Sequence, residues 1–132
     1  MKKRGHGEGK WNGFGGKVQE GESIEAAAQR ELQEEVGITA SGLERAGVLT
    51  FEYANDPDPM EVHLFRVTTF SGEPTESEEM RPQWFLTDAL PFDEMWPDDR
   101  FWMPLFLQGK TFNGHFVFDH SNQLIHQSLN ET

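Results

Sequence analysis

The apolar positions between residues 23 and 37 predict an amphipathic helix. Small and aliphatic side chains recur there at intervals of three and four, which places them on one face of a helix with ~3.6 residues per turn. Ser23 stands before this stripe as a suitable N-cap, and Gly37 follows it at the C′ position where many helices end. The stripe consists of Ile24, Ala27, Ala28 and Leu32.

Segments rich in β-branched and aromatic residues predict strands. Residues 45–53 (RAGVLTFEY) and 60–70 (MEVHLFRVTTF) are of this kind, and the turn-forming NDPDP at 55–59 lies between them. We therefore expect two strands joined by a loop. A shorter run, QWFLT at 83–87, predicts a further strand.

The last third of the chain predicts a second helix and a hairpin. Pro97 and the two aspartates after it open the helix, which runs to Gln108 and is closed by Gly109. Pro104 inside this helix should bend or tighten its first turns. The FVF triplet at 116–118, the turn DHSN and the segment QLIHQSL then predict two terminal strands.

The order of these elements indicates an α/β (α+β) fold in which a mixed sheet is flanked by helices. We find no repeat and no domain boundary, so residues 1–132 are predicted to form a single domain. Apolar residues make up 36% of the chain, which suits a compact core, and no apolar run approaches the ~18 residues that span a bilayer. Cysteine is absent, which excludes a disulfide framework and a thiolate metal site.

The net charge of −12 argues against general nucleic-acid binding through a basic surface. The first 17 positions are nevertheless basic, with Glu8 as their single acid. Two interpretations stay open, namely a solvated tail and a positive pole that holds a phosphate chain beside acidic groups. The basic residues of this segment are Lys2, Lys3, Arg4, Lys10 and Lys17.

Three glutamates on the first predicted helix suggest a cation site. Glu31, Glu34 and Glu35 stand at positions i, i+3 and i+4, so their side chains project from one face. Like charges at this spacing cost an isolated helix roughly 0.2–0.5 kcal/mol per pair. A sequence that accepts this cost is expected to place a cation there.

The residues around these glutamates match the Nudix box, GX5EX7REUXEEXGU, in which U is aliphatic. Gly16 is followed after five residues by Glu22, and after seven more by RELQEEVGI from Arg30 to Ile38. Every fixed position agrees. The chain therefore resembles the Nudix family, and the segments WNGFGGKVQEGE, ESEEMRP and MWPDD extend the likeness toward its MutT-type members.

The resemblance implies a mixed sheet sandwiched between helices, with the family's N-terminal strand missing, and a hydrolase that acts on nucleoside triphosphates. Cleavage between the α and β phosphates would give a monophosphate and pyrophosphate. The implied cofactor is Mg²⁺, with Mn²⁺ as an alternative, because such ions take oxygen ligands. The implied metal ligands are the Gly15 carbonyl and the side chains of Glu31, Glu34, Glu35 and Glu79. The four glutamates are also the implied catalytic residues. Since coupled carboxylates do not titrate independently, the sequence leaves open which glutamate is the general base.

Glu22 and Arg30 are interpreted as structural support, because an arginine beside Glu31 can pair with Glu22 and fix the loop against the helix. Without the box, an ordinary surface pair would be the default interpretation. Glu79 would likewise be one exposed acid among Glu76, Glu78 and Glu79.

The resemblance also implies that the substrates are oxidised purine nucleoside triphosphates (8-oxo-dGTP, 2-hydroxy-dATP and 8-oxo-dATP) and that their hydrolysis cleans the nucleotide pool. A tryptophan offers a flat face for stacking on a base. A neutral Asp donates a hydrogen bond where an ionised one accepts, so Asp98 and Asp99 could read both oxidised guanine and oxidised adenine. Asp98 could also be only a helix cap. The implied substrate-binding residues are Lys2, Asn12, Phe14, Gly15, Gly16, Lys17, Phe51, Met60, Trp96, Pro97, Asp98, Asp99 and Phe118.

The chain departs from the family at two places. His6 stands where the family usually has Phe, which puts the substrate preference in doubt. Fifteen residues precede Gly16, fewer than in the family, so we expect weaker substrate affinity and lower stability than in an N-terminally extended form.

A second hypothesis is an inactive or weakened truncated form that only binds nucleotide. A P-loop enzyme is excluded because the chain has no GxxxxGK[ST], and no GxGxxG supports a dinucleotide-binding fold. The resemblance further implies a cytosolic monomer with mitochondrial and nuclear pools, and neither a nucleic acid polymer nor a membrane as partner.

Overall fold

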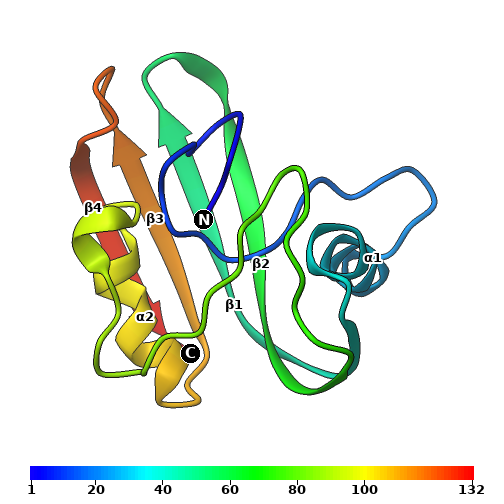
Figure 1. Cartoon of the computed structure of the whole chain (residues 1–132). Helices are drawn as coiled ribbons and strands as arrows, with labels where there is room; N and C mark the ends of the chain where they lie inside the picture. The colour runs from blue at the N-terminus through cyan, green and yellow to red at the C-terminus, as the bar shows by residue number, and fades with distance from the viewer. The chain divides into compact units, whose positions relative to one another are not determined.

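The computed structural model describes all 132 residues, which form four strands, two α-helices and one short 3-10 helix (Figure 1). In chain order these are α1 (Ile24–Val36), β1 (Thr39–Tyr53), β2 (Asp56–Ser71), η1 (Phe92–Glu94), α2 (Asp99–Leu107), β3 (Phe112–Phe118) and β4 (Leu124–Glu131).

The strands are ordered β2-β1-β3-β4, with β1 parallel to β3 and β3 antiparallel to β4, so the predicted mixed sheet is confirmed. The chain divides into two compact units. The first unit contains residues 1–44 and 67–96, and the second contains residues 45–66 and 97–132. The single domain remains a prediction, and each unit is described by itself below.

In the first unit, α1 has the bounds and caps that the sequence predicts. The Ser23 hydroxyl accepts a hydrogen bond from the Ala26 N–H at 3.1 Å, which satisfies one of the free donors of the first turn. Gly37 ends the helix in the left-handed region at φ 73°, a conformation that glycine adopts without steric cost. The apolar face of the helix joins a core made of Leu32, Val36, Ile38, Ala40 and Met80.

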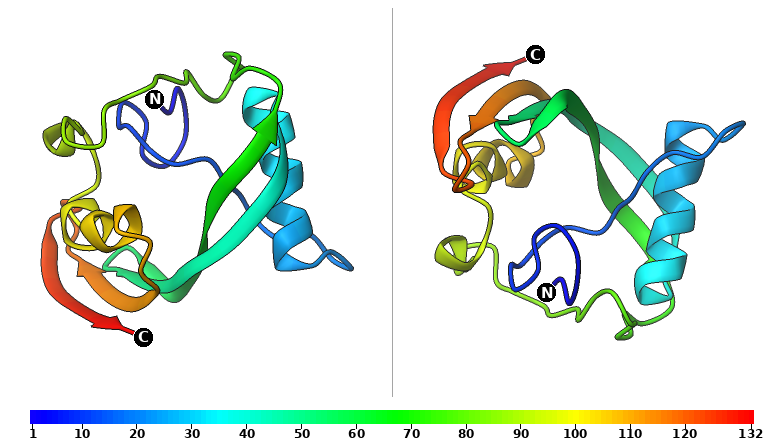
Figure 2. Two further views of the ribbon diagram at one scale, coloured as in Figure 1. Left: turned by 90° about the horizontal axis from the view of Figure 1, so that it is seen from below. Right: turned by 90° about the horizontal axis from the view of Figure 1, so that it is seen from above.

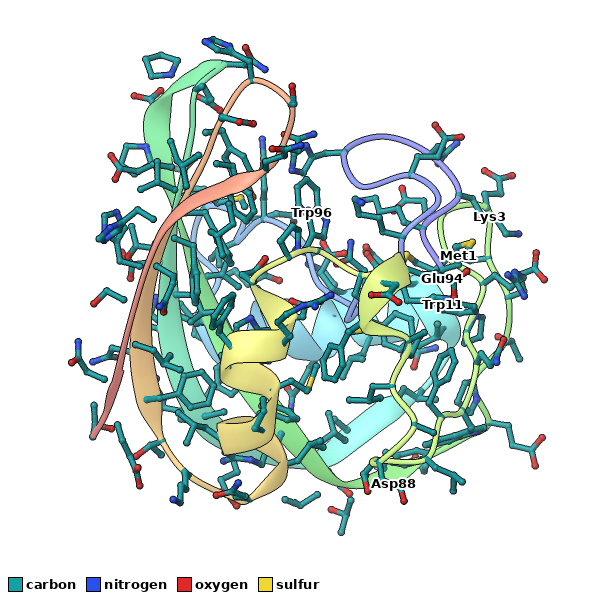
Figure 3. The ribbon with its side chains drawn as sticks, turned by 90° about the vertical axis from the view of Figure 1, so that its left-hand side faces the viewer. Met1, Lys3, Trp11, Asp88, Glu94 and Trp96 are labelled. Carbon is teal, nitrogen blue, oxygen red and sulfur yellow. The ribbon has the colours of Figure 1, made fainter.

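The N-terminal segment of this unit is hydrogen-bonded to residues 79–94. The Lys3 N–H donates to the Glu79 carbonyl and the Trp11 N–H to the Glu94 carbonyl, both at 2.8 Å. Figure 3 shows Met1, Lys3, Trp11 and Glu94 on the same side of the molecule. The first residues are therefore anchored rather than a solvated tail.

The strand predicted at 83–87 is wrong. These residues form no ladder, and the side chains of Trp84 and Leu86 are each 75% exposed, while Phe85 packs edge-on against Trp11 at 4.9 Å. A β-type composition becomes a strand only where a neighbouring strand pairs with it, and the structure provides none here.

In the second unit, β1 and β3 pair in a register that stacks aromatic side chains on one face. Phe51 pairs with Phe116, and Tyr53 pairs with Phe118. On the same face, Trp102 of α2 stacks on Phe112 with ring centroids 6.1 Å apart. The predicted terminal hairpin of β3 and β4 is confirmed, with Phe118 paired to Leu124 across the turn.

Two predicted boundaries in this unit are wrong. The loop expected at 55–59 is limited to residues 54–55, and Pro57 and Pro59 lie within β2. This strand is at the edge of the sheet, where a residue without an N–H can be accommodated. The second helix begins at Asp99 rather than at Pro97, and Pro104 lies inside it. Neither helix is long and apolar enough to cross a membrane.

Candidate active site

The acidic face of α1 is lined by a glycine-rich loop. In Figure 2, the segment before α1 runs alongside the helix and turns back into its first residue. The Gly15 N–H donates to Glu35 Oε2 at 3.3 Å, and a Cβ on Gly16 would lie only 2.4 Å from Glu31 Cδ. A side chain at position 16 would therefore displace the Glu31 carboxylate, which packs directly against the backbone.

Arg30 holds the loop and the helix together from the edge of this face. Its guanidinium donates two bonds to the Glu22 carboxylate, at 2.7 and 3.0 Å, and one to the Lys17 carbonyl at 3.1 Å. A third nitrogen reaches Glu31 at 2.8 Å and Glu34 at 3.1 Å. The predicted pairing of Arg30 with Glu22 is thus present, and it lowers the pKa of Glu22.

Glu35 differs from its neighbours because its side chain is buried, with 7% of the residue exposed. Burial raises the pKa of its carboxyl to about 7; the Gly15 N–H lowers it, the negative charges of Glu31 and Glu79 raise it further, and Lys2 lowers it. The fold therefore brings Lys2 and Glu79, which are distant in sequence, within electrostatic range of the helix. Glu35 is the carboxyl of this group that changes its charge near neutral pH.

Glu79 lies in the loop 76–82 and is held by the N-terminal segment. Arg4 donates to its carboxylate at 3.3 Å, and its carbonyl accepts from the Lys3 N–H. Lys2 forms an isolated bridge with Met80, so its backbone is fixed beside this loop.

These residues have the chemistry of a site for a hard divalent cation. Carboxylates and a backbone carbonyl are the ligands that Mg²⁺ prefers, and the buried Glu35 beside Glu31 and Glu79 leaves an excess of negative charge. The donor set therefore fits Mg²⁺. No three acidic or histidine side chains are already arranged around a common point, since Arg30 engages Glu31 and Glu34.

A second group of predicted site residues lies around Trp96 in the first unit. His6 stacks on the Trp96 ring at 4.8 Å, and Lys10 Nζ lies 5.4 Å from the centroid of the ring. A Cβ on Gly7 would approach both Trp96 Nε1, at 3.0 Å, and Asn12 Nδ2, at 3.2 Å, so these two side chains meet at Gly7. The imidazole of His6, which replaces the family's usual phenylalanine, therefore stacks on the ring of Trp96 in this structure.

In the second unit, Asp98 and Asp99 form a buried acidic pair, with 3% and 7% of each residue exposed. Trp102 Nε1 donates to Asp98 Oδ2 at 2.8 Å. Burial raises the pKa of Asp99 to about 8, helped by the charge of Asp98 and by the hydrogen bond that protonated Asp99 donates to it, and burial also raises the pKa of Asp98. Asp99 is therefore protonated at neutral pH.

The alternative that Asp98 is only a helix cap is wrong. It occupies the N-cap position, but its side chain makes no capping bond and binds the indole of Trp102 instead.

The remaining predicted residues are placed less distinctly. Phe51 and Phe118 are buried and their ring centroids lie 6.2 Å apart, and their role in lining a base pocket remains a prediction. Phe14 and Met60 are 37% and 42% exposed, and their roles remain predictions, as does that of Pro97. Sequence analysis missed Tyr53, although the two-residue period of a strand places it on the same face as Phe51.

Comparison with known proteins agrees with this geometry. A model of the NUDIX domain matches residues 1–106, which include the glycine-rich loop, α1 and the loop with Glu79. The oxidized purine nucleoside triphosphate hydrolase of Mus musculus is 54% identical over 131 residues, which cover 99% of this chain and 84% of the relative. The enzyme of the same name from Danio rerio is 53% identical over the same shares.

Among solved structures, the fold is similar to the MutT protein of Bacillus halodurans. The two superpose with a TM-score of 0.85 at 26% identity, over 92% of this chain and 82% of the other. With the family model, the two relatives and the box on α1 in agreement, this chain belongs to the Nudix hydrolase family.

Proposed function

We propose that this protein hydrolyses oxidised purine nucleoside triphosphates to the monophosphate and pyrophosphate with the help of a divalent cation. The observation that carries this proposal is the contact of Gly15 and Gly16 with Glu35 and Glu31. It gives one short loop both backbone groups for phosphate and a direct link to the carboxylates. The names of the mouse and zebrafish relatives support the class of substrate.

The cation would be held by the carboxylates of Glu31, Glu34, Glu35 and Glu79 with the Gly15 carbonyl. When bound, Mg²⁺ or Mn²⁺ would neutralise phosphate charge and lower the pKa of a water ligand. Arg30 orients Glu31 and Glu34 through its guanidinium. Lys2 lies within electrostatic range of Glu35, and Lys17 directly follows Gly16 in the loop. Glu35, with a pKa of about 7, is suited to accept a proton near neutral pH, so we assign it as general base.

Selection of the base falls to two sets of residues. Trp96 and Asn12 supply an aromatic face and an amide in the first unit. In the second unit, Asp99 keeps a proton near neutral pH and can donate a hydrogen bond, while a carboxyl oxygen of Asp98 accepts one. A pair with one donor and one acceptor can serve more than one oxidised purine.

A panel of normal and oxidised nucleoside triphosphates tests this proposal. Pyrophosphate release is measured with Mg²⁺, with Mn²⁺ and with a chelator, for the wild type, Glu35→Gln and Glu25→Gln. We expect turnover of the oxidised purines that needs the cation and falls by roughly 10²–10⁴ in Glu35→Gln. Glu25 lies exposed in the first turn of the same helix, so Glu25→Gln should keep full activity. Equal turnover of normal and oxidised nucleotides would contradict the proposed substrate class.

The second candidate function is nucleotide binding without hydrolysis. The engagement of Glu31 and Glu34 by Arg30 favours it, because the carboxylates are already paired. Saturable nucleotide binding without pyrophosphate release at any cation concentration would support this alternative.

A further inference from the structure

Tyr53 is the single tyrosine of the chain and belongs to the aromatic face of the second unit. It ends β1 and pairs in register with Phe118 of β3. The rings of Tyr53 and Phe118 stack with centroids 5.3 Å apart and planes inclined by 12°. The ring of Phe51 also stacks on that of Tyr53, with centroids 6.3 Å apart. The ring of Tyr53 is therefore fixed by two phenylalanines.

Helix α2 covers this face with its acidic end toward Tyr53. A loop at 108–111 returns the chain from α2 directly into β3, so helix and strand run in opposite directions, as Figure 1 shows. Trp102 stacks on Phe112, at the first residue of β3. Asp98, one turn earlier in the helix, consequently lies on the Phe118 side, which is also the Tyr53 side.

The electrostatics of Tyr53 agree with this placement. Burial raises the pKa of Tyr53 to about 12, and the negative charge of Asp98 contributes to the rise. The phenol thus keeps its proton at neutral pH and is a hydrogen-bond donor toward a carboxylate. A nearby donor in turn favours the ionised form of that carboxylate.

Few other charges face the acidic pair. Glu52 and His115, which bond to each other, belong to the opposite face of β1 and β3, because Phe51, Tyr53, Phe116 and Phe118 occupy this one. From β2, Arg66 reaches α2, but at its far end, where it donates to the Phe106 carbonyl at 2.7 Å. Arg100, on α2 itself, is exposed. On the aromatic face, Trp102 therefore donates to Asp98 directly, and Tyr53 lies within electrostatic range of the same carboxyl.

We propose that Tyr53 is a positioning residue for the Asp98–Asp99 pair, whose hydroxyl, with the indole of Trp102, keeps Asp98 ionised and the shared proton on Asp99. It thereby helps to decide which oxidised purines the pair accepts, a role that rests on the proposed function. A phenylalanine at position 53 would fill the same space, but without the hydroxyl the shared proton would be less strongly confined to Asp99.

The first test needs no nucleotide, because the unique tyrosine makes its ionisation visible by ultraviolet absorbance. The wild type and Asp98→Asn are titrated toward about pH 11, above the usual phenol pKa, with the fold followed by circular dichroism. We expect the variant to form tyrosinate at clearly lower pH while still folded. Identical titrations would overturn the proposal, whatever the activity of the protein.

The second test measures specificity. The ratio of kcat/KM for 8-oxo-dGTP to that for 2-hydroxy-dATP is followed against pH in the wild type, Tyr53→Phe and Trp102→Phe. We expect Tyr53→Phe to change the ratio about fivefold, the size of one typical net hydrogen bond, and to move the acid limb of the pH profile upward. Trp102→Phe, which removes the other donor, should move the limb in the same direction. A ratio and profile unchanged in Tyr53→Phe but shifted in Trp102→Phe would overturn the role of Tyr53.

Failure of the proposed function would look different. If the wild type hydrolysed neither nucleotide, the proposed function and the specificity role would both fall, while the titration of Tyr53 would still decide whether its hydroxyl is coupled to Asp98.

Discussion

The acidic group on α1 and the acidic pair at the start of α2 balance their charge in different ways. On α1, Arg30 compensates Glu22, Glu31 and Glu34 with direct ion pairs. At α2, no cation bonds to Asp98, and burial raises the pKa of Asp99 to about 8 so that the pair keeps a proton. Glu35 belongs to the first group, but like Asp99 it is buried and its pKa is raised, to about 7.

The difference shows that the environment, rather than the residue type, assigns the chemistry. Ionised carboxylates held by a guanidinium can exchange that partner for a metal ion. A protonated pair in an apolar setting offers one donor and one acceptor, which suits recognition of a base edge. Acidic side chains are thus suited to phosphate chemistry on α1 and to recognition of the base at the start of α2.

Gly16→Ala gives the largest expected effect, a loss of activity, because it disturbs the arrangement of the acidic group on α1. The added Cβ would lie 2.4 Å from Glu31 Cδ, so the carboxylate or the loop must move. A displacement of about 1 Å at a reacting centre can cost on the order of 10² in rate, and we expect this loss in kcat/KM. Gly13→Ala is the matched control, because its Cβ would meet nothing within 4 Å. Similar activity in both variants would refute the role of this contact.

Arg30→Lys sharpens the same comparison, since it keeps the charge but removes the two-pronged bond to Glu22. We expect the Mg²⁺ concentration for half-maximal activity to rise by about 10–100-fold, as is usual when a residue that orients metal ligands is changed. The variant should also melt at lower temperature, because the loop loses its tie to α1. Arg45→Lys, at an exposed position on β1, serves as control. An unchanged Mg²⁺ requirement would show that Arg30 does not orient these ligands.

The buried pair predicts how stability depends on pH. Asp99 ionises near pH 4 in an unfolded chain but at about 8 in the fold. Between these values the folded state holds a proton that the unfolded state has lost, so the free energy of unfolding decreases as pH rises, by at most about 1.4 kcal/mol per pH unit. Urea unfolding at several pH values should show this decline in the wild type and a weaker one in Asp99→Asn. Parallel curves for the two proteins would contradict the raised pKa.

Ser23→Ala gives the smallest effect and tests the helix rather than its charges. Loss of the bond from the Ala26 N–H to the Ser23 hydroxyl should lower the free energy of unfolding by about 1 kcal/mol. Catalysis should change little, because the cap lies at the end of α1 away from Glu35. Ser121→Ala, in the exposed turn before β4, should leave stability unchanged. A large loss of activity in Ser23→Ala would mean that the cap also positions the carboxylates.

Elements whose signals are local could be predicted from the sequence. The first helix has its cap, its apolar stripe and its terminal glycine within fifteen residues, and the structure reproduces all three. The spacing of Gly16, Glu22 and Arg30 likewise anticipated the pairing of Arg30 with Glu22. Where pairing with a distant segment decides, prediction failed, as with Trp84 and its neighbours, which form no strand.

By itself, the sequence determined the acidic helix, its glycine-rich loop and the class of chemistry they serve, because helical periodicity and motif spacing are properties of adjacent residues. Only the tertiary structure decided which carboxyl groups are protonated. The raised pKa values of Glu35 and Asp99 come first from burial, and the contacts of Asp98 with Trp102 and of Glu35 with Gly15 join separate turns or segments. Desolvation depends on everything packed around a side chain, which no local pattern specifies.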